Sequence, residues 1–449
     1  MSNKDVQGGG SVKPEVRLRK PNRMQVEMLV QCPDALVSPT HQVRLVAAFV
    51  ATLDLSGFCQ PIKARQGTAG RDATDPQLLV SLWLYGCIRG IGSARELARR
   101  CGPDEGSRPF HWLCGGVSVN HHMLSDFRVE HADALDELFT QVLTTLIDKG
   151  LVKVKRISQD GVRVRACAGA DSFRREERLA KLLEQAQQHV AQLRRQLDDP
   201  AYAAGLSARQ KAARTRAAKE KADRLQEAIA QLPELKEKQK EAAKRAGNGK
   251  HGQKIRDKEP RVSTTDDEAR VMKMPNGGFN PAVNVQLATD TESRAIVGVA
   301  VSNEGSDSAG LSEPMRQQVE QRTGQKVQQH LLDGGYMKLQ DIEQAHEQDV
   351  ELFMPPKPAR NQANRGKELE PKPGDGEGIL AWKARMDSAA GQETYKQRAA
   401  TSETVNADLR GHRGLVQLTV RGLAKGRCVA LWCALAYNVM HFAGALLLQ

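Results

Sequence analysis

Apolar residues recur at helical spacing through the first third of the chain. The stretch "DPQLLVSLWLYGCIRGIGSARELARRCG" predicts a helix from Pro76 to about Ile88, a turn at Gly90 and Gly92, and a short helix capped by Ser93. A further helix is predicted in "SDFRVEHADALDELFTQVLTTLIDKG", where apolar positions recur every three or four residues. The pattern therefore predicts an all-α segment.

We place this helical domain at residues 24–150. The preceding residues 1–23 are polar and rich in Gly, Pro and charge, which predicts a disordered basic arm without a secretory signal. Two helices joined by a tight glycine turn predict a helix-turn-helix-like DNA-binding unit, with Arg95, Arg99 and Arg100 on its second helix as candidate DNA contacts. The same pattern fits an ordinary helical hairpin with solvated arginines, so both interpretations stay open.

Residues 174–246 have a different period. Leucines and other apolar residues step by four and three on both sides of the turn "DDPAYAAGLS", as in the seam of a coiled coil, and Ser207 with Gln210 can form a capping box. We expect an antiparallel coiled-coil hairpin. Residues 174–258 contain 22 Lys and Arg against 12 Asp and Glu. Such a run is either a solvated face or an arm lying on DNA phosphates.

Strand-like and helix-like segments alternate in the second half of the chain, from "FNPAVNVQLATD" to "VELFMPP", which predicts an α/β sheet domain. We assign it to residues 151–449, with the coiled coil as an insertion. Residues 357–392 are rich in Pro, Gly and charge and are predicted to be a loop insertion. The apolar segment 428–448 is long enough to span a membrane, but Asn438 and His441 within it favour a buried core helix.

The composition predicts an anionic partner. The chain of 449 residues has a formal charge of +12, and nucleic acid is the commonest polyanion that such a protein binds. Charge alone does not separate DNA from RNA or from an anionic membrane. The eight cysteines form no C-x-x-C pair, which argues against a zinc site and against a disulfide scaffold.

Two aspartates stand beside glycine in strand-like runs. Asp160 lies in "KVKRISQDGVRVRACAG", where Asp-Gly is also the signal of a type I′ hairpin turn. Asp333 ends the apolar run of "VQQHLLDGGYM", where a turn acid is again the alternative. Acids at the ends of strands are where sheet proteins hold ligands and catalytic groups. Each of the two carboxylates is therefore a candidate ligand or catalytic group.

A third polar set lies in "ETYKQRAATSETVNADLRGHRGL". Tyr395, Arg398 and Arg410 fall near one side of a predicted helix, and Glu403 lies at the edge of that side. Helical spacing alone favours a solvated face here over an active site.

Four stretches of the chain together resemble the DDE transposases of bacterial insertion sequences. They are "SQDGVRVRACAGADSFRR", "STTDDEARVMKMPNGGFNPAVNVQLATDT", "LLDGGYM" and the predicted helix with Tyr395, Arg398, Glu403 and Arg410. The resemblance is to the group whose third acidic region reads Tyr-x2-Arg-x3-Glu-x6-Lys, and it extends over nearly the whole chain, the helical first part included. Two departures are visible. Arg398 and Glu403 are separated by four residues instead of three, and Arg410 replaces the lysine. Arginine keeps the charge and can hold phosphate with two hydrogen bonds.

The resemblance implies an α/β fold, namely a ribonuclease H-like mixed sheet interrupted by the coiled-coil hairpin and preceded by the helix-turn-helix-like domain. Asp160, Asp333 and Glu403 would then form one catalytic cluster that binds two Mg²⁺ ions, with Mn²⁺ as an alternative. Such ions activate water or a 3′-OH for attack on a phosphodiester and stabilise the leaving oxygen.

The resemblance also implies the partners. Tyr395, Arg398 and Arg410 would hold the DNA backbone of the transposon end, and the substrates would be terminal inverted repeats and target DNA. Pairing of two ends implies a homodimer or a larger assembly, without a membrane partner, in the cytoplasm at the bacterial nucleoid. The predicted function is Mg²⁺-dependent strand cleavage at insertion-sequence ends and transfer of the 3′-OH into target DNA. The alternative is a catalytically inactive, transposase-derived DNA-binding protein.

Overall fold

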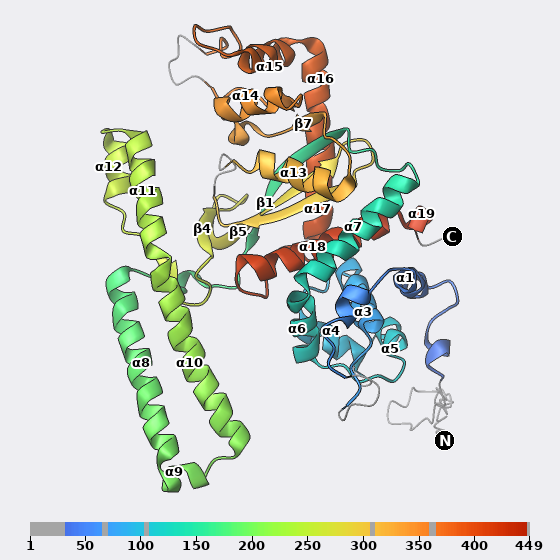
Figure 1. Ribbon diagram of the computed structural model, residues 1–449, viewed down its shortest axis with the longest axis vertical. Helices are drawn as coiled ribbons and strands as arrows, with labels where there is room; N and C mark the ends of the chain where they lie inside the picture. The colour runs from blue at the N-terminus through green and yellow to red at the C-terminus, as the bar shows by residue number, and fades with distance from the viewer. Residues whose placement is uncertain (1–31, 65–70, 103–106, 306–309, 359–364, 447–449) are drawn as a thin grey trace, which may run out of the picture.

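The computed structural model describes residues 32–64, 71–102, 107–305, 310–358 and 365–446 (Figure 1). The predicted basic arm, residues 1–23, lies outside the described residues. Within them the chain forms a helical first part, a mixed sheet with its own helices, and a long helical arm inserted between the first strand and the rest of the sheet.

The helical first part is built around α3, which has all but two of its residues buried. Asp75 caps this helix by accepting a hydrogen bond from the backbone N–H of Gln77, and Ser93 caps α4 in the same way with Glu96, as the sequence predicts. The elements are η1 (Pro33–Leu36), α1 (Gln42–Ala51), α2 (Ser56–Cys59), α3 (Pro76–Ile88), α4 (Ala94–Cys101), α5 (Arg108–Cys114), α6 (His121–Glu130) and α7 (Ala132–Asp148).

Strand β1 (Arg156–Arg165) lies in the middle of the main sheet, antiparallel to β5 (Phe279–Asp290) and parallel to β7 (Gln329–Leu331). Beyond β7 runs β8 (Glu351–Phe353), which is parallel to it. The other edge of β5 is antiparallel to β4 (Arg270–Lys273) in its first part and to β6 (Ile296–Ser302) in its second. The sheet therefore combines an antiparallel half with a parallel half, and β1 belongs to both.

The sheet and the helical first part share one hydrophobic core. Helix α18 (Leu423–His441) joins them, because it packs on β6 on one side and on α3 and α7 on the other. Its polar residue Asn438 is fully buried and bonds both backbone groups of Ile296, with Nδ2 to O at 2.8 Å and N to Oδ1 at 2.9 Å. The part of the apolar segment that lies in α18 is thus a core helix. Among the described residues no helix is both long and apolar enough to cross a membrane.

The remaining helices surround the sheet. Helix α13 (Ser312–Thr323) packs on β6, and α14 (Leu339–Glu347) and α15 (Glu377–Asp387) pack on β8 around a smaller core. A continuous helical path then runs through α16 (Ala389–Arg398), the π-helical turn η5 (Ala399–Glu403) and α17 (Thr404–Gly411) past β1 and β5. The short elements are η2 (Ala170–Ser172), η3 (Gly334–Tyr336) and α19 (Ala443–Leu446).

The prediction that residues 357–392 form a loop insertion is wrong for their second half. Helix α15 and the start of α16 lie there, and Trp382 is almost fully buried with its indole N–H donating to the carbonyl of Met354. The Pro- and Gly-rich composition belongs to the first half, where the described residues 365–376 contain no helix or strand. Burial of the apolar residues of α15 against β8 outweighs the polar composition of the wider segment.

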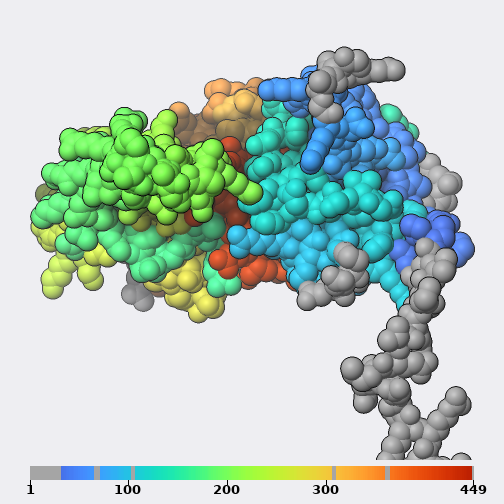
Figure 2. All heavy atoms as spheres, turned by 90° about the horizontal axis from the view of Figure 1, so that it is seen from below, coloured from blue at the N-terminus to red at the C-terminus, as the bar shows by residue number. Residues whose placement is uncertain are grey.

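The inserted arm consists of α8 (Glu176–Asp198), α9 (Pro200–Ala204), α10 (Ala208–Ala230), α11 (Leu232–Ala246) and α12 (Lys250–Arg256). Helices α8 and α10 pack side by side through a seam that includes Leu179, Ala186 and Leu225, and the predicted capping box of Ser207 and Gln210 is present. Strands β2 (Phe173–Arg174) and β3 (Val262–Ser263) pair at the base of the arm. Seen from the end at which α9 lies, the green arm and the blue-to-cyan helices make up most of that face (Figure 2).

Candidate active site

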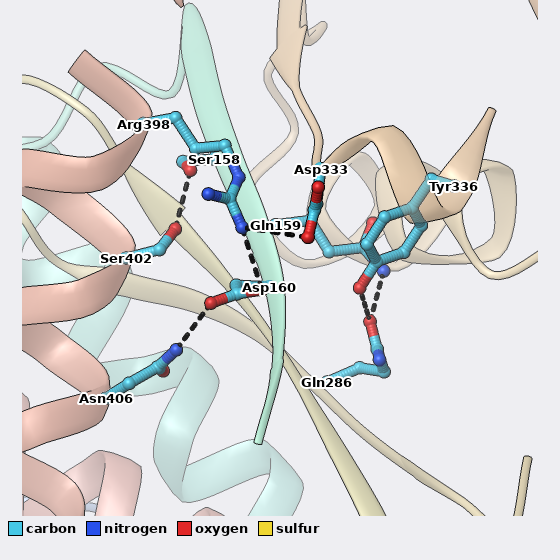
Figure 3. A network of polar contacts seen from close by, with 9 residues as sticks. All are labelled: Ser158, Gln159, Asp160, Gln286, Asp333, Tyr336, Arg398, Ser402 and Asn406. Carbon is cyan, nitrogen blue, oxygen red and sulfur yellow. Dashed lines mark hydrogen bonds and ion pairs between the residues drawn. The ribbon is translucent and has the colours of Figure 1, made fainter. Parts of the chain in front are cut away.

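The two candidate aspartates lie on neighbouring parallel strands at equivalent positions. Ser158 of β1 pairs with Leu331 of β7, and Asp160 and Asp333 each follow two residues later. Because side chains alternate between the two faces of a sheet, this equal offset directs both carboxylates to the same face. Figure 3 shows them facing each other across a narrow gap that holds the guanidinium of Arg398.

Asp160 is not in a turn. Strand β1 continues straight through Asp160 and Gly161, which lie opposite Leu287 and Gln286 of β5. The hairpin-turn interpretation of Asp-Gly is therefore wrong, because pairing with β5 fixes the backbone of both residues in the extended conformation. Asp333, by contrast, stands where β7 ends and the 3₁₀ turn η3 begins, as the sequence predicts.

Arg398 and Asn406 hold the Asp160 carboxylate from the helical side. Arg398 Nη2 lies 3.0 Å from Asp160 Oδ1 and 3.9 Å from Asp333 Oδ2, and Asn406 Nδ2 donates to Asp160 Oδ2 at 2.9 Å (Figure 3). The side chains of Arg398 and Asp160 are 13% and 21% exposed, whereas that of Asp333 is 55% exposed. The positive charge of Arg398 therefore compensates a carboxylate that little water reaches, while Asp333 stays open to solvent.

The helical path through η5 brings these groups to β1. Arg398, Ser402 and Asn406 are spaced four residues apart, which places them on one side of a helix. Ser402 at the centre of this side is buried, and its hydroxyl lies 2.6 Å from that of Ser158 on β1. This contact fixes the distance between helix and strand at the carboxylates. The sequence prediction missed Ser402 and Asn406, although their spacing from Arg398 is the signal that could have found them.

Glu403 is exposed at the end of η5, beside this network. Successive residues of a helix are rotated by about 100°, so the residue after the inward-facing Ser402 points away from β1. Within the part of the chain that the structure describes, no group of three or more His, Cys, Asp or Glu side chains is placed to hold a metal ion. The structure thus brings Asp160 and Asp333 together with Arg398 and does not bring Glu403 to them.

Tyr395 lies one turn before Arg398 and is half-buried against the core of α14 and α15. Burial raises the pKa of its hydroxyl, the positive charge of Arg398 lowers it, and the carboxylates of Asp333 and Asp160 raise it again. These influences mark Tyr395 as a neighbour of the site. Arg410 is exposed in the last turn of α17.

The three candidate arginines of α4 lie in the helical first part of the chain. Hydrogen bonds from Arg99 and then Arg100 lower the pKa of Glu96 on the same helix to about 2. Arg95 is exposed. The charge of this helix is therefore partly neutralised within the helix itself.

A buried polar network supports the carboxylates from the opposite face of β1. Gln159 Nε2 donates to Gln286 Oε1 of β5 at 2.9 Å, and the hydroxyl of Tyr336 donates to the same oxygen (Figure 3). Tyr336 ends the 3₁₀ turn that follows Asp333. The network ties this turn to β1 and β5, and so holds the backbone of Asp333 next to that of Asp160.

Two models of known families match the chain. A transposase domain (DUF772) matches residues 31–130, which include α1 to α6, and a transposase DDE domain matches residues 360–443, which include the helix of Arg398 and Glu403. No curated protein and no solved structure matches. Residues 31–130 and 360–443 are thus similar to domains of transposases, the second of them to a DDE domain. Asp160 and Asp333 lie outside both matched segments.

Proposed function

We propose that this transposase cleaves DNA at the ends of its own insertion sequence and joins the freed 3′-OH to target DNA, with divalent cations held by Asp160 and Asp333. The observation that carries the proposal is the pair of carboxylates on β1 and β7 with a positive charge between them. Its setting adds support, since an antiparallel β1–β5–β6 unit extended by parallel β7 and β8 is the strand arrangement expected of a ribonuclease H-like domain.

The residues fit a divalent cation. Two carboxylates on one face already bind a cationic group, the guanidinium of Arg398, and Asp333 is open to the solvent from which a hydrated ion would arrive. Mg²⁺ and Mn²⁺ prefer oxygen ligands, and Mg²⁺ keeps several waters, so a few carboxylates suffice. When bound, a pair of such ions activates the attacking oxygen and stabilises the leaving oxygen.

Glu403 is the third carboxylate of the proposal. It ends the π-helical turn η5, and turns of this type are frequent at functional sites because they shift the helical phase within a few residues. Reaching the gap would require η5 to rearrange when DNA and metal bind. Tyr395 and Arg410, on the same helical path, would contact the backbone of the bound DNA end.

We further propose that at least two copies pair the two ends of the element and that the protein works in the cytoplasm, at the DNA of the nucleoid. The helical first part would contribute DNA contacts through Arg95, Arg99 and Arg100 of α4. For Arg99 and Arg100 to contact DNA, their hydrogen bonds to Glu96 would have to break.

The test is cleavage of a labelled duplex that carries the element's terminal repeat, in Mg²⁺ and in EDTA. Asp160→Asn, Asp333→Asn and Glu403→Gln should bind this duplex with unchanged affinity and should not form a 3′-OH. Asp387→Asn, which changes an exposed aspartate at the end of α15, is the matched control and should cut normally. An intact protein that binds the duplex without cutting it, or Asp→Asn variants that cut normally, would refute the proposal.

A further inference from the structure

The outer part of the inserted arm carries an uncompensated positive charge. We define the distal arm as residues 185–219, which include the end of α8, α9 and the first half of α10, and which lead away from the sheet (Figure 1). It contains seven basic and two acidic residues. The basic residues are Arg194, Arg195, Arg209, Lys211, Arg214, Arg216 and Lys219, and the acidic residues are Asp198 and Asp199.

The base of the arm is built differently. There Lys181 pairs with Glu177 at 2.5 Å, Lys236 with Glu176 at 2.6 Å, and Lys238 with Glu234 at 2.7 Å. Across the described residues no ion pair forms with any basic side chain of the distal arm. The chain thus pairs cations with acids near the sheet, whereas the basic side chains of the distal arm have no such acidic partners among the described residues.

The few polar contacts of the distal arm do not neutralise it. Arg214 donates to the neutral hydroxyl of Tyr202 at 2.7 Å, and Asp199 accepts from the backbone N–H of Ala201 as the cap of α9. Of the side chains that α8 contributes between Gln185 and Gln192, none is acidic. The excess charge therefore faces solvent.

The surface of the distal arm is not apolar. Its seam residues Ala186, Leu193 and Ala218 are buried between α8 and α10, and none of the large exposed hydrophobic residues among those described lies on the arm. A partner that binds by hydrophobic contact, such as another helix or the interior of a membrane, finds no matching surface there. The surface is complementary to a polyanion.

The distal arm is long enough to follow a stretch of DNA backbone. The part of α10 that belongs to it, residues 208–219, has 12 residues. At 1.5 Å per residue this length is about 18 Å, about half of one helical turn of B-DNA. Arg209, Arg214, Arg216 and Lys219 of this part are exposed, so they can present charge to phosphates over about half a turn.

We propose that the distal arm binds the sugar-phosphate backbone of duplex DNA without reading its sequence, at a distance from the carboxylates of the candidate active site. The inference rests on the proposed function as a DNA transposase and adds a further DNA contact to it. The arm anchors the duplex, and the carboxylate site acts on the strand.

The test compares two variants that remove the same charge. The arm variant carries Arg209→Gln, Lys211→Gln, Arg214→Gln and Arg216→Gln. The base variant is the matched control and carries Lys181→Gln, Lys236→Gln, Lys238→Gln and Lys240→Gln, which change cations that are paired with acids. Glutamine keeps a good helix propensity, and circular dichroism checks that both variants retain the helical content of the wild type.

The measurement is fluorescence anisotropy of a labelled duplex of random sequence over a range of salt concentrations. Each lost phosphate contact lowers the magnitude of the slope of log K against log salt by about 0.9. We therefore expect this magnitude to fall by about 3.6 in the arm variant and by less than about 1 in the base variant. Equal losses in both variants would overturn the inference, because net charge alone would then explain binding.

Two further outcomes would also overturn it. If the arm variant keeps the wild-type slope and loses self-association in sedimentation, the distal arm is a contact between copies of this chain. If the arm variant keeps both the wild-type salt slope and the wild-type self-association, the basic residues of the distal arm only face solvent. In either case the proposed function stands, whereas failure of the wild-type protein to bind any duplex, its own terminal repeat included, would contradict the proposed function itself.

Discussion

Replacement of Arg398 by methionine tests whether this side chain occupies the place of a divalent cation. The guanidinium lies 3.0 Å from Asp160 and 3.9 Å from Asp333, and a metal ion bound by both carboxylates would have to displace it. Arg398 Nε is buried and has no hydrogen-bond partner in the described part of the chain, so the arginine is only partly satisfied in this position. Methionine keeps the length of the side chain and removes its charge.

The size of the effect follows from the contact that is lost. A hydrogen bond between charged groups contributes about 1.5–3 kcal/mol. We take the lower end because Asp160 is 21% exposed and water weakens the pair. Since 1.4 kcal/mol corresponds to a factor of ten, Arg398→Met should bind a divalent cation about ten times more tightly than the wild type does.

The assay is titration with Mn²⁺, whose free form is measured by electron paramagnetic resonance, in the absence of DNA. Asp160→Asn should weaken binding, which shows that the ion is at this site. Arg385→Met is the matched control, because Arg385 is 18% exposed and pairs with Glu351 on β8. Equal or weaker Mn²⁺ binding by folded Arg398→Met would refute the argument.

Two further predictions concern stability. Asp136→Asn should lower the free energy of unfolding, measured in urea, by about 3 kcal/mol. The side chain of Arg322 is 4% exposed and lies 2.8 Å from Asp136, so the substitution leaves a buried cation between α7 and α13 without this partner. An unchanged urea midpoint would contradict this prediction. Burial of His330 and, to a smaller extent, the positive charge of Arg316 hold the pKa of the His330 imidazole well below its usual value. Below about pH 6.5 the unfolded chain therefore binds a proton that the folded protein does not bind. Stability should therefore fall as the pH falls from 6.5 to 5, by up to about 1.4 kcal/mol per unit, and His330→Gln should remove this part of the slope; an identical slope in both proteins would refute the assignment.

Local signals predicted the helices well. The bounds of α3, the cap of α4 at Ser93 and the capping box at Ser207 all depend on residues within a few positions of each other, and the structure contains each of them. The apolar segment near the C-terminus was predicted to favour a core helix because Asn438 interrupts it, and the structure shows why the residue is there: it bonds the backbone of Ile296 on β6.

The errors came where distant segments decide the conformation. Asp-Gly is a good local signal for a turn, but pairing with Leu287 and Gln286 of β5 keeps Asp160 and Gly161 extended. These partners lie more than a hundred residues away in the chain, beyond the inserted arm. Their pairing cannot be inferred from the spacing of neighbouring residues.

The candidate site was predicted in part. Asp333 at the end of a strand and Arg398 on a helix could be recognised locally, and the structure brings both to Asp160. Asn406 was not recognised, although its spacing of eight residues from Arg398 places both on one side of a helix. Glu403, one residue after the inward-facing Ser402, lies at the surface.

The central claim is that the carboxylates of Asp160 and Asp333 bind the catalytic cations. The most direct test measures 3′-OH formation on a duplex with the terminal repeat by Asp160→Cys and Asp333→Cys, in Mg²⁺ and in Mn²⁺. Mg²⁺ demands oxygen ligands, whereas Mn²⁺, as a transition metal, accepts sulfur more readily. We predict that each variant is inactive in Mg²⁺ and regains cutting in Mn²⁺, while the corresponding asparagine variants stay inactive in both. Cutting in Mg²⁺ at the wild-type rate by any of these variants would contradict the account.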